Sequence, residues 1–136
     1  MVSQMSERQS DFPWYVFVIG IAGGVLMLLG GAIALVNPTM LAKGEVINGA
    51  VRVYAGYLVS RNIAVGAMLL GALFLRARSA LSTLMLLAGA IQILDAVIDC
   101  ADGRWMIAPG VAVLGIAFLF AARKLGSIRV PARGSD

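Results

Sequence analysis

The stretch WYVFVIGIAGGVLMLLGGAIALV, residues 14–36, decides the fold of this chain. Its 23 residues include no charged side chain, and about 20 helical residues suffice to cross the hydrocarbon core of a bilayer. Asn37 and Pro38 follow at once and favour an end to the helix. A signal peptide has a shorter apolar region and a small-residue cleavage site, so we expect a retained transmembrane helix.

Three further apolar segments follow, and we predict helices over residues 53–75, 79–98 and 105–125. The links at residues 76–78 and 101–104 are so short that the helices they join must run antiparallel. The sequence therefore predicts an all-α polytopic membrane protein, a four-transmembrane-helix bundle. The predicted domains are an N-terminal tail (1–12), a transmembrane domain (13–125) and a basic C-terminal tail (126–136).

The composition agrees with a protein whose environment is the lipid bilayer. Hydrophobic residues make up 60% of the chain and charged residues 13%, and the mean hydropathy is +0.91. The net charge of +4 is spread over segment ends, so it argues for membrane topology and not for nucleic-acid binding. The chain has no histidine and one cysteine, which excludes His-based triads and CxxC redox centres, and we expect neither a metal nor a cofactor.

The positions of the cations predict the topology. With four spans, both chain ends and the turn at residues 76–78 share one side of the membrane. That side carries seven cations and the other side three. Because cytoplasmic segments are enriched in Lys and Arg, we expect a cell-membrane protein with both termini in the cytoplasm. The seven are Arg8, Arg76, Arg78, Arg123, Lys124, Arg129 and Arg133, and the three are Lys43, Arg52 and Arg104.

Two opposite charges fall inside predicted spans. Arg61 precedes Arg76 by 15 residues and Asp95 follows Arg78 by 17. At 1.5 Å per residue, both lie roughly 22–25 Å from the same side of the membrane, on neighbouring helices. A lone charge in hydrocarbon is costly, so we expect Arg61 and Asp95 to pair.

Further polar residues lie beside this pair at helical spacing. We assign Arg61 to an anionic group of a ligand, the tyrosines to its apolar body and Asp95 to a possible proton-carrying role, in an outward-facing polar cavity. In the alternative interpretation, the polar residues only fix the register of the helices. The candidate ligand-binding residues are Arg61, Asp95, Gln92, Tyr57, Tyr54 and Asn62, with Asp99 and Asp102 at the rim.

Small residues form a stripe on the first predicted helix. Gly20, Gly24 and Gly31 share one face, and such stripes allow helices to approach closely. Two interpretations are open: packing inside the bundle, and a contact between copies in a homo-oligomer.

The pattern Arg61-Asn62-Ile63-Ala64-Val65-Gly66, followed by LDAVID at residues 94–99, carries a resemblance. It resembles small four-helix integral membrane proteins of unknown function from bacteria and fungi, over roughly residues 49–126. In those proteins a helix with Arg-x-Ile/Leu-Ala-x-Gly is similarly followed by a helix bearing an aspartate. The acidic residue that often follows their arginine is Asn62 here. The resemblance implies a fold and a membrane location, and no particular activity.

Several functions are compatible with these features. Our first interpretation is a bundle that binds a small molecule or lipid near Arg61 and Asp95. An accessory or structural subunit of a membrane complex is the alternative. A membrane isomerase or lipid-modifying enzyme using Asp95 as acid/base is weaker, because no nucleophile motif is present. A transporter of this size would need an oligomer to supply enough spans.

Overall fold

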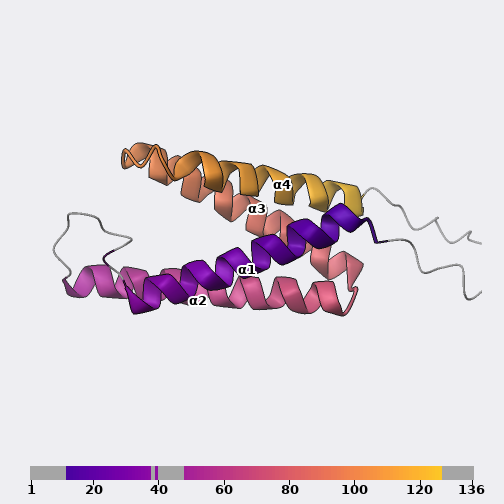
Figure 1. Ribbon diagram of the computed structural model, residues 1–136, viewed down its shortest axis with the longest axis horizontal. Helices are drawn as coiled ribbons and strands as arrows, with labels where there is room; N and C mark the ends of the chain where they lie inside the picture. Colours follow the sequence, from indigo (N-terminus) through magenta and orange to yellow (C-terminus); the bar gives the residue numbers. More distant parts are fainter. Residues whose placement is uncertain (1–11, 38, 40–47, 127–136) are drawn as a thin grey trace, which may run out of the picture.

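The computed structural model describes residues 12–37, 39 and 48–126. This part of the chain forms four helices and no strand (Figure 1), which confirms the all-α prediction. They are α1 (Trp14–Val36), α2 (Gly49–Phe74), α3 (Arg78–Ala101) and α4 (Ala108–Gly126). Each of them is long and apolar enough to cross a membrane.

Three helix ends differ from the prediction by three residues or more, while α1 covers the same 23 residues as the apolar run. α2 begins before residue 53 because Asn48 caps it, with Asn48 Oδ1 accepting a hydrogen bond from the Val51 amide at 3.0 Å. α3 continues past residue 98 to Ala101. α4 begins only at Ala108, because Gly103, with φ of +73°, turns the chain sharply before it.

The helices are arranged as two closely packed antiparallel pairs, α1 with α2 and α3 with α4. Each pair has a glycine on both helices where they come close. A Cβ added at Gly66 would lie 3.1 Å from the Gly24 carbonyl oxygen, and one added at Gly89 would lie 3.0 Å from that of Gly115. Because glycine has no side chain, the two backbones of each pair can approach closely.

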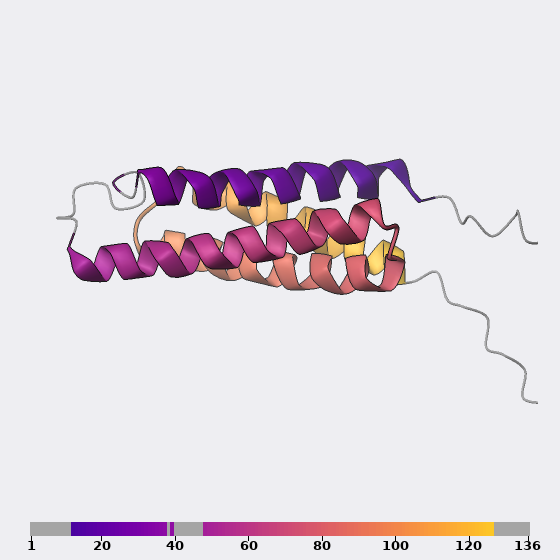
Figure 2. The same cartoon turned by 90° about the horizontal axis from the view of Figure 1, so that it is seen from below.

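The buried core lies toward one end of the bundle, which we call the inner end. The starts of α1 and α3 and the ends of α2 and α4 meet there (Figure 2). Figure 1 shows the two pairs close together at the inner end and diverging toward the opposite, outer end. The largest fully buried side chains are Phe118, Leu69, Leu73, Leu81, Met85 and Val16.

Phe118 of α4 packs against α1 in this core and so joins the two helix pairs. Its side chain is fully buried, and a Cβ added at Gly23 of α1 would overlap its ring. A glycine at position 23 therefore lets an aromatic ring from α4 reach the backbone of α1.

The small-residue stripe of α1 packs inside the bundle. A Cβ added at Gly20 would lie 3.2 Å from Met85, and one added at Gly24 would lie 2.8 Å from Leu70. A Cβ added at Gly31 would lie 3.3 Å from a side chain of α2. All three glycines are buried. Internal packing is thus the interpretation that the structure supports, since this face is covered within one copy of the chain.

Candidate functional site

Arg61 of α2 and Asp95 of α3 form a two-point ion pair. Arg61 Nη2 donates to Asp95 Oδ2 at 2.8 Å, and Nη1 donates to Oδ1 at 3.2 Å. This geometry matches the planar guanidinium to the planar carboxylate. Because α2 and α3 belong to different helix pairs, the ion pair connects the two halves of the bundle.

The ion pair lies on the outer side of the core. Leu69, which is fully buried, follows Arg61 by eight residues on α2, or about 12 Å along a helix. Ala88, also fully buried, precedes Asp95 by seven residues on α3. The core therefore closes the space between α2 and α3 on the inner side of the pair.

The ion pair is only partly covered by protein. The Arg61 side chain is 35% exposed and the Asp95 side chain 28%. Arg61 Nε is buried and has no hydrogen-bond partner among the residues that the structure describes. An ion pair within a membrane span gains from further polar partners on its open side, because hydrocarbon solvates charge poorly.

The other candidate ligand-binding residues contact neighbouring helices or are exposed. Asn62 lies against α1, with its Cβ 3.5 Å from a Cβ added at Gly31, and the Gln92 Cβ lies 3.2 Å from one added at Gly115 of α4. Tyr54 and Tyr57 are 62% and 72% exposed. Among the predicted ligand-binding residues that are described, hydrogen bonds join only Arg61 and Asp95.

The rim residues lie at the outer end of α3. Asp99 is half-buried and forms an ion pair with Arg104, at 3.7 Å between Oδ1 and Nη1. Asp102 is exposed at the end of the helix, where its amide donates to the Ile98 carbonyl oxygen at 2.9 Å. Sequence reasoning missed Arg104 as the partner of Asp99. The sequence signal for this ion pair was Gly103, because a turn at this glycine brings Arg104 back toward α3.

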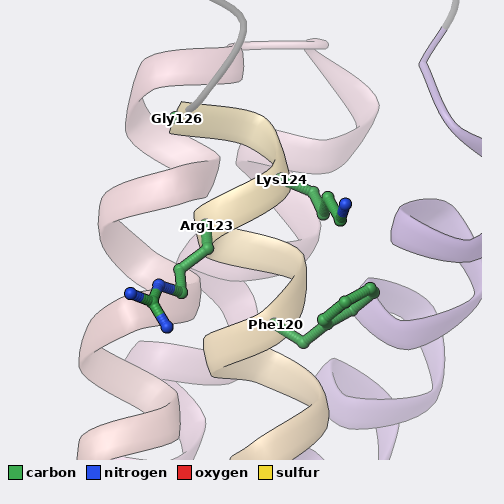
Figure 3. Close-up of a pocket in the computed structure, with 4 residues that line it drawn as sticks. All are labelled: Phe120, Arg123, Lys124 and Gly126. Carbon is green, nitrogen blue, oxygen red and sulfur yellow. The ribbon is translucent and has the colours of Figure 1, made fainter.

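Two cavities lie away from the ion pair. One of about 360 Å³ lies between the outer ends of α1 and α2, and one of about 590 Å³ lies at the inner end of α4 (Figure 3). Within the described residues, no cluster of three or more His, Cys, Asp or Glu is placed to hold a metal ion. The lining residues are Ala34, Leu35, Arg52, Ala55, Gly56 and Val59 in the first cavity, and Phe120, Arg123, Lys124 and Gly126 in the second.

Fold and site together define a class: a four-helix bundle of membrane-spanning length with an ion pair between its two helix pairs. No family model, curated protein or solved structure matches the chain. The resemblance carried by the Arg61 and Asp95 segments therefore stays a prediction from the sequence.

Proposed function

We propose that this protein is a multi-pass cell-membrane protein that binds an anionic small molecule or lipid group at the Arg61–Asp95 pair. The observation that carries the proposal is the partial exposure of a two-point ion pair within spans of membrane length. Ionisable groups inside a membrane are costly and usually serve a binding or transport site.

The chemistry of Arg61 favours a carboxylate or phosphate as the bound group. A guanidinium carries five N–H donors. Asp95 accepts one hydrogen bond from Nη1 and one from Nη2. Nη1 and Nη2 each keep a second N–H, from which an anionic oxygen arriving on the open side would accept, as both anions commonly do from guanidinium groups; Nε is buried. The bound anion would then share Arg61 with Asp95.

We further propose that both termini lie in the cytoplasm, so that the ion pair lies in the outer half of the membrane. The cation count supports this orientation, with seven on the side of the termini and three on the other. A ligand would then reach Arg61 from the outer leaflet or from outside the cell.

A partner subunit is the second candidate occupant of the open side. Tyr54 and Tyr57 lie two turns and one turn before Arg61 on α2, and both are largely exposed. Aromatic residues with a polar tip are enriched at protein interfaces. A helix of another membrane protein packed on this face would cover the ion pair without any small ligand.

Mass spectrometry of molecules extracted from protein purified in mild detergent tests the proposal. We expect an anionic compound bound to the wild type and to Arg104→Gln, a control that removes an outer cation away from the pair. The double variant Arg61→Met with Asp95→Leu should lose it, while apolar replacement of both charges preserves the fold. Retention by the double variant, or a copurifying protein in place of the compound, would count against a ligand at Arg61.

A further inference from the structure

The cavity at the inner end of α4 combines an aromatic wall with two cations. Its volume is about 590 Å³, and Phe120, Arg123, Lys124 and Gly126 line it. Lys124 Nζ lies 5.5 Å from the centre of the Phe120 ring, within the range of a cation–π contact. Figure 3 shows Lys124 and Phe120 on one side of α4 and Arg123 directed to the other.

The aromatic wall extends onto α1. The ring of Tyr15 lies 6.1 Å from that of Phe120, and Trp14 packs edge-on against Tyr15 at 6.3 Å. Trp14 is 76% exposed. Aromatic residues of this kind collect at the level of lipid headgroups, so this end of α1 and α4 has the composition of a membrane interface.

Both cations that line the cavity lie in the last turn of α4. Arg123 and Lys124 are adjacent in the sequence, so their potentials add at this end of the helix and attract an anion.

We propose that this cavity binds the phosphate of an anionic phospholipid from the leaflet at the inner end. Lys124 contacts the phosphate, Arg123 adds attraction from the other side of α4, and an acyl chain lies against Phe120 and Tyr15. Basic pockets at the ends of membrane helices bind such headgroups. The aromatic wall favours a lipid over free phosphate, because only a lipid has an apolar chain to bury there.

This proposal is independent of the one for Arg61, since it uses other residues at the other end of the bundle. Lipid titration followed by native mass spectrometry tests it, with the full chain in mild detergent and phosphatidylglycerol compared with phosphatidylcholine. We expect the wild type to retain phosphatidylglycerol preferentially. Lys124→Gln should weaken that preference about fivefold, the factor typical of one cation near a membrane surface.

The matched control is Arg76→Gln, which removes a cation at the same end of the bundle but outside the cavity. It should leave the preference nearly unchanged, and Lys124→Arg should preserve it. Equal retention of the two lipids by the wild type would overturn the proposal. So would an equal loss in Arg76→Gln and Lys124→Gln, which would indicate diffuse attraction, or full competition by inorganic phosphate, which would indicate a site for the free anion.

Discussion

The Arg61–Asp95 ion pair connects the outer halves of the two helix pairs. Arg61 and Asp95 face each other across α2 and α3 with two hydrogen bonds. Removing one partner leaves a charge that neither hydrocarbon nor protein solvates well, whereas removing both leaves an apolar surface that a membrane accepts. The energetics of the pair are therefore strongly non-additive.

We predict that Arg61→Met and Asp95→Leu each lower the free energy of unfolding by about 3–5 kcal/mol, the cost of leaving one charge of a buried pair without its partner. The partial exposure of the two side chains does not reduce this cost, because hydrocarbon, unlike water, solvates a charge poorly. The double variant should be milder than the sum of the two. Thermal unfolding in detergent compares the wild type, the two single variants and the double variant. If the two losses of stability simply add in the double variant, the residues are not partners.

Packing at Gly23 gives a second prediction for a single residue. Gly23→Ala should destabilise the bundle by about 1–3 kcal/mol, because the added methyl group would overlap the Phe118 ring. Gly71→Ala is the matched control: no atom lies within 4 Å of its added Cβ, and Ala is favoured over Gly inside a helix. Combining Gly23→Ala with Phe118→Leu should recover part of the loss. Equal tolerance of Gly23→Ala and Gly71→Ala would contradict the packing described for Phe118.

For whole elements, the sequence predicts spans better than it predicts their ends and faces. The unbroken apolar run defines α1 completely. The apolar segment used to predict α2 begins at residue 53, but the helix begins earlier, because Asn48 caps it. Apolar length thus locates a membrane helix, while its ends depend on single hydrogen bonds.

Helical spacing also placed Tyr54 and Tyr57 on the face of α2 that carries Arg61, yet both tyrosines are largely exposed. The reason is the reach of the side chain: a long arginine at the edge of an exposed face can extend sideways to Asp95 on the neighbouring helix. Spacing along one helix shows which residues share a face. It does not show how far a neighbouring helix covers that face, so the pair could be predicted from matched depth but the surroundings could not.

The cap of α2 supports a prediction for this element. Asn48→Ala should cost about 1 kcal/mol and let the first turn of α2 fray, because the Val51 amide loses its partner. Asn48→Asp keeps an accepting oxygen at the same place and should preserve the turn. Hydrogen exchange of the Val51 amide reports the difference. Unchanged protection in the alanine variant would mean that the cap does not set the start of the helix.

The molecule as a whole is polarised along its long axis. The apolar core occupies the inner half, where all four helices meet, and the ion pair lies between the diverging helix pairs beyond it. The two helix pairs are therefore in close contact at the inner end and further apart at the outer end. If a polar group binds at the ion pair, as proposed, the orientation in the membrane decides from which side of the cell it comes.

The native cysteine can test this orientation. Cys100 is half-buried near the outer end of α3, so a membrane-impermeant thiol reagent should label it in intact cells if both termini are cytoplasmic. Asp102→Cys, at an exposed position two residues further, serves as a control for reagent access. Labelling of both cysteines only after the membrane is permeabilised would reverse the proposed topology.

A crystal structure of the protein grown in a lipid phase is the most direct test of a binding site at Arg61 and Asp95. We predict density for a non-protein anionic group on the open side of the pair, with an oxygen about 2.7–3.0 Å from a guanidinium nitrogen of Arg61. Density for hydrocarbon chains alone against the exposed part of the pair, or protein side chains that seal it completely, would contradict the account.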